Sequence, residues 1–262
     1  MKFLTLNCHS WQEDKQIEKI KYIAKTINGN DYDVIALQEV SQKIDSKVVY
    51  ENIKEDNFAL VLQKELRKLG NFNYNFFWDM CHIGYDIYEE GLCLMTKLPI
   101  HKKESFFITN NNDYNFWKTR KIVKLKVSYE GEEISFYSCH LGWWHDEDEP
   151  FINQVDKLYE DIKEENIAFI MGDFNNNANI KNEGYDYLCK NLIDTYSLAI
   201  KKDDGVTVEG NIAGWDYNNE KLRLDLILSN KKIEVLSSNV IFNNINKDIV
   251  SDHYGVEIEV KI

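Results

Sequence analysis

The sequence has little that would divide the chain or send it into a membrane. Among 262 residues there are two prolines, and no Gly/Ser-rich linker, internal repeat or long run of like charges interrupts it. Residues 1–10 lack the long apolar segment and small-residue cleavage site of a signal peptide. No apolar run approaches the ~18 residues needed to span a bilayer. We therefore expect one domain over residues 1–262, a cytoplasmic location and no membrane partner.

Paired cysteines and an excess of basic residues are also missing. The five cysteines are an odd number without a CxxC pair, which argues against a disulfide framework or a zinc site and predicts reduced thiols. The chain has 31 basic and 44 acidic residues, for a net charge of −13. Nucleic-acid binding depends on Lys and Arg contacts to phosphates. The nearest basic stripe is short and consists of Lys118, Arg120, Lys121, Lys124 and Lys126. We expect no nucleic-acid partner, whereas the surplus carboxylates would attract divalent cations.

Hydrophobic residues, 44% of the chain, recur mostly with the alternating period of strands. The helical period predicts helices at 12–27, 58–69, 147–165 and 185–189. Strands are predicted at 3–6, 33–37, 74–78, 91–95, 100–108, 120–127, 134–138, 167–171, 222–228, 233–241 and 254–260. Many strands with few helices, outside strict β-α-β alternation, favour two packed sheets with helices outside. The expected fold is therefore α/β, a four-layer α/β/β/α sandwich with mainly antiparallel sheets.

Polar residues stand at the ends of several apolar strands, where a rigid strand can present them to a ligand. They are Asn7, Glu39, His140, Asp173, Asn175, Asp225, Asp252 and His253. Singly, most have an ordinary explanation as turn residues, solvated strand ends or core histidines. Asp225 fits such an explanation poorly, because burying an unpaired charge is costly. Their coincidence favours one site, and the oxygen atoms of Asn7, Glu39 and Asp252 suit a hard cation such as Mg²⁺.

The motifs around these residues, in their order, resemble the endonuclease/exonuclease/phosphatase superfamily of DNase I-like phosphoesterases. The resemblance covers essentially the whole chain. It rests on Leu6-Asn7, Leu37-Gln38-Glu39-Val40, Ser138-Cys139-His140-Leu141, Gly172-Asp173-Phe174-Asn175, Arg223-Leu224-Asp225 and Ser251-Asp252-His253. It implies a DNase I-like sandwich and a metal-dependent hydrolase of phosphate esters.

The resemblance also implies roles for the metal ligands and for the phosphate contacts. Glu39 would be the main Mg²⁺ ligand, with Mn²⁺ as an alternative ion, and Asn7 and Asp252 would complete the site directly or through water. Asp173 and Asn175 would position the attacking water and a phosphate oxygen.

The two histidines follow from the same resemblance. His253, oriented by Asp225, would contact the phosphate, and His140 would be the second histidine of the site. Glu90, or the adjacent Glu89, would orient His140. The general base stays open between Asp173 and the His253/Asp225 pair.

Three further segments, at 81–91, 140–144 and 213–216, resemble the bacterial maltose 6'-phosphate phosphatase branch of the superfamily. Trp143 and Trp144 would offer flat faces to sugar rings. Tyr85, Asp86 and Trp215 would contact the ring or its hydroxyls, and Arg120 would bind the phosphate in a bidentate manner. The favoured reading is a phosphomonoesterase acting on a small phosphorylated sugar, without a protein partner.

Two other classes of function stay open. One is a phosphodiesterase acting on DNA, as an abasic-site endonuclease or exonuclease does, or on a phospholipid head group, as a sphingomyelinase does. The net charge and the acidic run 146–149 disfavour DNA. The other class is a non-catalytic binding module, which the intact set of carboxylates and histidines disfavours.

Overall fold

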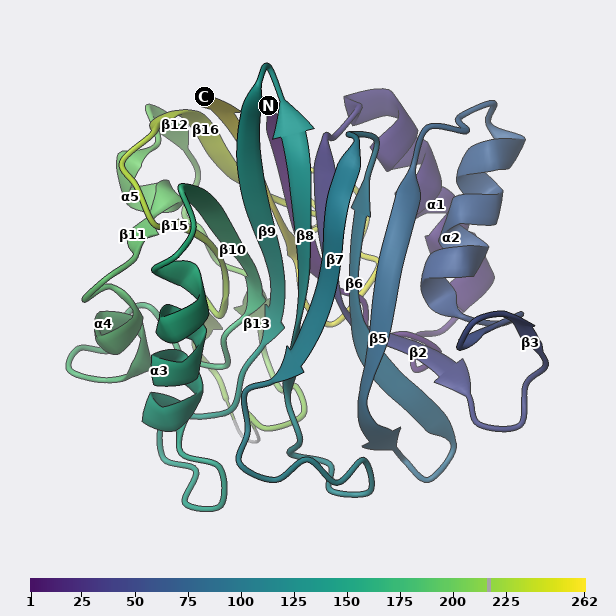
Figure 1. The fold of residues 1–262 in the computed structure, drawn as a ribbon, viewed down its shortest axis with the longest axis horizontal. Helices are drawn as coiled ribbons and strands as arrows, with labels where there is room; N and C mark the ends of the chain where they lie inside the picture. Colours follow the sequence, from purple (N-terminus) through teal and green to yellow (C-terminus); the bar gives the residue numbers. More distant parts are fainter. Residues whose placement is uncertain (216–217) are drawn as a thin grey trace.

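The computed structural model describes residues 1–215 and 218–262, and these form stacked layers of helix and sheet (Figure 1). The first sheet has the strand order β12-β16-β17-β1-β2-β6-β5. Its strands are β1 (Lys2–Asn7), β2 (Val34–Lys43), β5 (Asn75–Gly84), β6 (Tyr88–Thr96), β12 (Lys201–Lys202), β16 (Glu234–Ile241) and β17 (Gly255–Lys261).

The second sheet has the strand order β11-β15-β10-β9-β8-β7. Its strands are β7 (Ile100–Phe107), β8 (Lys121–Tyr129), β9 (Glu132–His140), β10 (Ile167–Asp173), β11 (Ile193–Asp194) and β15 (Asp225–Ser229). Two small additional sheets pair β3 (Val48–Tyr50) with β4 (Ile53–Lys54), and β13 (Val208–Glu209) with β14 (Lys221–Leu222). Neighbouring strands are antiparallel except in the pairs β1–β2, β9–β10 and β12–β16, which are parallel.

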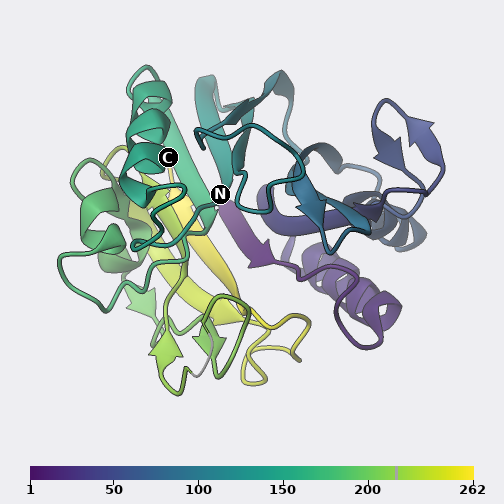
Figure 2. The same cartoon turned by 90° about the horizontal axis from the view of Figure 1, so that it is seen from below.

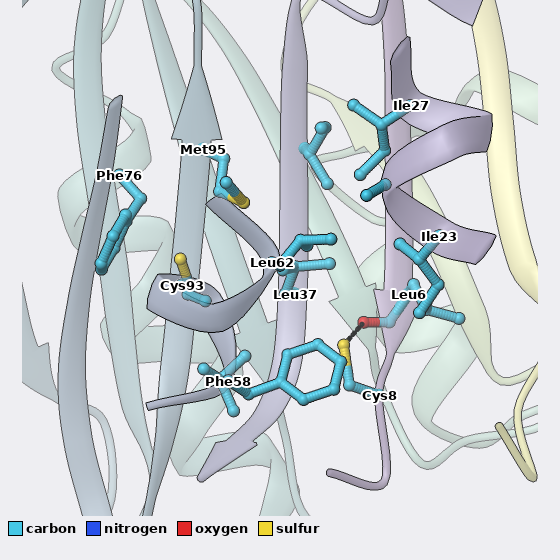
Figure 3. Close-up of a cluster of buried hydrophobic side chains, with 14 of the residues drawn as sticks. Leu6, Cys8, Ile23, Ile27, Leu37, Phe58, Leu62, Phe76, Cys93 and Met95 are labelled. Atoms are coloured by element: carbon cyan, nitrogen blue, oxygen red, sulfur yellow. Dashed lines mark hydrogen bonds between the residues drawn. The ribbon is translucent and has the colours of Figure 1, made fainter. Parts of the chain in front are cut away.

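Helices cover the outer faces of both sheets. The helices α1 (Gln16–Asn30) and α2 (Phe58–Lys68) pack on the first sheet, where Ile23 and Leu62 contact a core that includes Leu6 and Leu37 (Figure 3). The helices α3 (Phe151–Ile162) and α4 (Gly184–Leu188) cover the second sheet, and α5 (Thr195–Leu198) packs at β15 and β16. The predicted four-layer α/β/β/α sandwich is confirmed. No helix of the residues described is long and apolar enough to cross a membrane.

The two sheets are held together by a buried aromatic cluster. The rings of Phe136 and Phe169 stack with centroids 5.4 Å apart, and Phe3 meets Phe169 edge-on at 4.6 Å. Such rings each bury a large apolar area and prefer stacked or edge-on geometries. Because β1, β9 and β10 supply these rings, the cluster fixes the strands whose ends carry the polar motifs.

The central strands bring those polar motifs to one edge of the sandwich. The parallel register of β9 and β10 sets His140 beside Asp173, and antiparallel β15 sets Asp225 on the other side of Asp173. In β1 and β2 the register aligns Asn7 with Gln38, next to Glu39. This edge is the lower one in Figure 1, and Figure 2 views the molecule from that side.

Several predicted elements differ from the structure, and the strands predicted at 33–37 and 74–78 continue to Lys43 and Gly84. The helix predicted at 12–27 begins at Gln16, whose side-chain oxygen accepts a bond of 2.7 Å from the Trp11 backbone and holds residues 9–15 as a loop. The helix predicted at 147–165 is shorter, because Pro150 caps it and the preceding acidic residues form a turn on Asp146. The strand predicted at 222–228 is divided between β14 and β15.

Candidate active site

An extra residue in β2 directs Glu39 into the site. Leu37 pairs with Cys93 and Val40 with Gly91, so Gln38 and Glu39 together face a single residue of β6. Glu39 has φ 50°, an uncommon conformation for a residue with a side chain. Leu37 and Val40 both pack toward the helices, whereas Gln38 bonds to Ser138 of the other sheet at 3.1 Å. Regular alternation would have turned Glu39 toward the helices with Leu37, so the bulge is what makes it available to a ligand.

One carboxylate oxygen, Asp173 Oδ2, lies where three nitrogen atoms converge. Asn7 Nδ2 donates to it at 3.2 Å, and the Nε2 atoms of His140 and His253 lie 3.6 and 3.7 Å away. Asn7 Nδ2 also donates to Glu39 at 2.9 Å. The structure thus brings together Asn7, Glu39, His140, Asp173 and His253, although Glu39 lies inside β2 and not at its end.

His253 is held by a buried carboxylate on its far side. Its Nδ1 lies 2.9 Å from Asp225 Oδ2, which leaves Nε2 directed at Asp173. Burial lowers the pKa of His253, but the charges of Asp225 and Asp173 outweigh burial and raise it well above the usual value. The imidazole is therefore a hydrogen-bond donor at neutral pH.

His140 has the opposite electrostatic environment. Burial, and then the charges of Arg120 and His253, lower its pKa well below the usual value. Its ring is therefore neutral, beside the cationic ring of His253. Asp173 therefore faces one neutral imidazole, of His140, and one cationic imidazole, of His253.

The carboxylate of Glu90 lies nearest to a different histidine from the one expected. Its Oε1 is 3.4 Å from His82 Nε2, while His82 Nδ1 lies 3.2 Å from the carbonyl of Thr119. Burial and then the charge of Glu39 raise the pKa of Glu90 to about 8, and burial lowers that of His82 to about 3. The predicted role of Glu90 in orienting His140 stays a prediction, because Glu90 contacts His82 and His140 contacts Asp173.

Arg120 is buried at the same edge. Its Nη1 donates to the carbonyl of Trp117 at 3.1 Å, and its guanidinium lies 5.9 Å from the centre of the Trp143 ring. Its Nε is buried without a hydrogen-bond partner among residues 1–215 and 218–262. A buried N–H group without an acceptor costs free energy of folding. A phosphate oxygen bound beside Arg120 would supply that acceptor.

A cavity of ≈ 340 Å³ opens among these residues. Most of the predicted site residues line it, namely Glu39, Tyr85, Glu90, Arg120, His140, Trp143, Asp173, Asn175, Asp252 and His253. Asn7 and Asp225 bond to its wall from behind. Trp144 and Trp215 line a neighbouring cavity. Asp86 is exposed on the turn after β5, outside the described lining of either cavity, and Asp216 lies outside the described residues.

The endonuclease/exonuclease/phosphatase family model matches residues 4–253, nearly the entire chain. The chain belongs to this family. Its members hydrolyse phosphate esters, so the reaction class is that of a metal-using phosphoesterase. No protein among the curated ones matches the sequence.

Solved structures agree with the family assignment. An endonuclease/exonuclease/phosphatase family protein from Leptotrichia buccalis is 41% identical over the full length of both chains, with a TM-score of 0.94. A mannosyl-6-phosphatase from Bacteroides thetaiotaomicron has 17% identity and a TM-score of 0.72, again over both full chains. Truncated TDP2 from Caenorhabditis elegans has 15% identity and a TM-score of 0.66, covering all of this chain and 97% of its own. The last two similarities show a shared fold.

Sequence reasoning missed three residues that line the cavity: His9, His82 and Trp117. His9 Nδ1 lies 2.7 Å from Glu13 and 3.7 Å from Asp252. His82 comes from the bulge of β5, and Trp117 from the loop between β7 and β8. His82 lies within the 81–91 segment that the sequence analysis singled out, whereas His9 and Trp117 lie outside every motif used for the resemblance.

The residues predicted to bind a metal fit a hard divalent cation. Burial, and then the charge of Asp252, raise the pKa of Glu39. Two carboxylates crowded in this way favour a cation between them, and Mg²⁺ and Mn²⁺ prefer oxygen donors. Asn7 adds a carboxamide oxygen, which now accepts from the His9 backbone at 3.1 Å.

Proposed function

We propose that this family member is a Mg²⁺-dependent phosphomonoesterase that hydrolyses a small phosphorylated sugar, with maltose 6'-phosphate as the reference candidate. The observation that carries the proposal is the convergence of Asn7, His140 and His253 on one oxygen of Asp173. A phosphoryl group placed there would find donors on its oxygens and a carboxylate beside the attacking water.

Glu39, Asp252 and Asn7 would hold the metal ion. Bound there, Mg²⁺ supplies neutralisation of the charge that develops on the phosphoryl and leaving oxygens, and Mn²⁺ has the same ligand preference.

Asp173 is the proposed base, because its carboxylate lines the cavity, whereas the charges of Asp225 and Asp173 raise the pKa of His253 and favour its protonated form. The buried Asp225 keeps that proton available by pairing with Nδ1 of His253 at 2.9 Å. His253 Nε2 then donates to a phosphoryl oxygen. Asn175 lies two residues after the end of β10 and has a left-handed φ of 49°. Its side chain lines the same cavity.

The ion pairs of the basic stripe support a small substrate over DNA. Lys118 pairs with Asp146 at 2.8 Å and with Asp148 at 2.7 Å. Lys121, Lys124 and Lys126 each form ion pairs with carboxylates of neighbouring strands or of the segment around α3. Of the stripe, Arg120 lines the cavity. Polyanion binding needs many cationic side chains that are free to contact phosphates. The four lysines of the stripe are instead already paired with carboxylates.

The decisive experiment measures phosphate release with Mg²⁺, with and without a chelator. The panel holds maltose 6'-phosphate, trehalose 6-phosphate, glucose 6-phosphate and a duplex with an abasic site. We expect chelator-sensitive release from a sugar phosphate and no strand cleavage. Cleavage of the duplex alone would instead identify a phosphodiesterase and overturn the argument from charge.

A further inference from the structure

A second cavity, of ≈ 770 Å³, adjoins the catalytic one, and we call it the tryptophan cavity. The two share the wall residues Trp117, Trp143, Asn175 and Gly214. The catalytic cavity, at ≈ 340 Å³, is near the lower end of ligand pockets, which span roughly 300–1,000 Å³. A ligand larger than that volume could therefore continue past Trp143 into the second cavity.

The lining of the tryptophan cavity combines flat aromatic faces with carboxylates. The Trp117 and Trp143 rings lie with centroids 6.0 Å apart, and the Trp144 ring is fixed edge-on to Phe151 at 6.1 Å. Its acidic residues are Asp146, Glu147, Asp148 and Glu183. Lys118 is matched by Asp146 and Asp148, so the lining keeps an excess of negative charge. Such a surface repels an anionic chain and suits an uncharged ligand with apolar faces and many hydroxyl donors.

The residues that separate the two cavities pack closely against one another. Gly214 has φ +81°, and a Cβ at this position would lie 2.4 Å from Trp143 Cζ2. The indole nitrogen of Trp143 is buried without a hydrogen-bond partner among residues 1–215 and 218–262. On the other side, Trp215 Nε1 donates to Asn175 Oδ1 at 3.3 Å. The tryptophan cavity is thereby in direct contact with a residue of the catalytic wall.

We propose that the tryptophan cavity binds an uncharged sugar ring that the substrate carries beyond its phosphorylated ring. The inference rests on the proposed phosphatase function and adds the size of the leaving group. The enzyme then selects a phosphorylated sugar of at least two rings over a phosphorylated monosaccharide. Glu183 accepts hydroxyl hydrogens from the distal ring, and the tryptophans contact its faces.

The test compares kcat/KM for maltose 6'-phosphate and glucose 6-phosphate, which differ by one ring, at saturating Mg²⁺. Wild-type protein is expected to prefer the disaccharide by about 10-fold or more, which corresponds to about 1.4 kcal/mol of added binding. Glu183→Gln should lower this ratio by roughly 3- to 10-fold through KM, the range for one lost hydrogen bond. Ile180→Trp, which fills the cavity from its exposed rim, should lower the ratio further.

Glu160→Gln is the matched control, because its side chain is 72% exposed on α3 and pairs with Lys163. It should keep the wild-type ratio. Equal kcat/KM for the two sugars in wild-type protein, or a preference unchanged in both cavity variants, would overturn the inference and leave the phosphatase intact. No phosphate release from either sugar would overturn the proposed function itself, and this inference with it.

Discussion

Two buried charge clusters on the second sheet differ in how completely their charges are matched. Beneath α3, Lys124 Nζ lies 2.6 Å from Asp161 and 2.9 Å from Glu165, and Lys126 also reaches Glu165 at 3.0 Å. We call this the Lys124 cluster. At the end of the same sheet, the catalytic cluster places Asp173 between two imidazoles, with further carboxylates beside it.

The charges of the Lys124 cluster stabilise the fold, whereas those of the catalytic cluster lack partners that a bound ligand would supply. In the Lys124 cluster Ser135 donates to Glu165 and Tyr137 to Asp161, each at 2.6 Å, so each carboxylate has a hydroxyl donor as well as a lysine. In the catalytic cluster burial raises the pKa of both Glu39 and Glu90, and a neighbouring carboxylate raises each further, Asp252 for Glu39 and Glu39 for Glu90. The first arrangement lowers the free energy of the folded chain, whereas the second becomes favourable only with cation and phosphate present.

The largest expected effect is in the catalytic cluster. Asp173→Asn should lower kcat by about 10³-fold, within the range of general acid–base catalysis, because the amide cannot accept the proton of the attacking water. The unfolding free energy should change far less than kcat does, because asparagine has nearly the size of aspartate and keeps an oxygen that can accept from Asn7. Phosphate release and urea denaturation measure the two quantities. Asp156→Asn on the exposed face of α3 is the control, and wild-type turnover in Asp173→Asn would refute the site.

The next effect belongs to the Lys124 cluster. Lys124→Met should lower the unfolding free energy by about 3 kcal/mol, because Asp161 and Glu165 lose a buried partner. Turnover at saturating substrate should stay at the wild-type value. Lys126→Met, in a side chain 26% exposed, should cost about 1 kcal/mol or less. Equal losses in both variants would show that burial does not distinguish the two lysines.

A smaller change is expected in metal affinity. Glu39→Ala should raise the Mg²⁺ concentration for half-maximal activity by at least about 10-fold, equivalent to about 1.4 kcal/mol of lost binding. The measurement is a Mg²⁺ titration of phosphate release. An unchanged midpoint, with activity retained, would remove Glu39 from the ligand set.

The smallest effect is in the pH dependence of stability. Burial raises the pKa of Glu165, but hydrogen bonds from Ser135, Lys124 and Lys126 outweigh burial and lower it to about 2. An unpaired glutamate has a pKa of about 4.3, so this carboxylate adds stability above that pH and loses it as the pH falls toward 2. The difference in unfolding free energy between wild-type protein and Glu165→Gln should therefore shrink between about pH 4.3 and 2. A constant difference would show that Glu165 is not preferentially ionised in the folded state.

The sequence predicted the layers and the strand ends better than it predicted the loops. The strands followed from alternation, and Glu39, His140, Asp173 and His253 meet because their strands share an edge. Alternation cannot reveal a bulge. The partnership of His82 with Glu90 depends on a bulge in β5 whose extra residue lies between Met80 and His82.

Loop geometry was also beyond the sequence. The acidic run at 146–149 was read as a charged face that repels DNA, but Glu149 is buried and accepts from the backbones of Asn110 and Asn111 at 2.8 and 2.7 Å. Long-range bonds of this kind connect segments nearly 40 residues apart. No local pattern encodes them, and they join the loop that carries Trp117 to the loop that carries Trp143.

The bulge in β2 has a consequence for insertions and deletions. Substituting Gln38 would alter its side-chain bonds with Ser138, at 3.1 Å, and with Thr5, at 3.3 Å. Deleting Gln38 would instead restore regular pairing and draw Glu39 back by about one strand residue, roughly 3.3 Å, into the place of Gln38 between the sheets. The carboxylate would then still be encoded but would no longer reach the cavity. Relatives that lack one residue before this glutamate should therefore have lost the activity even where every site residue is retained.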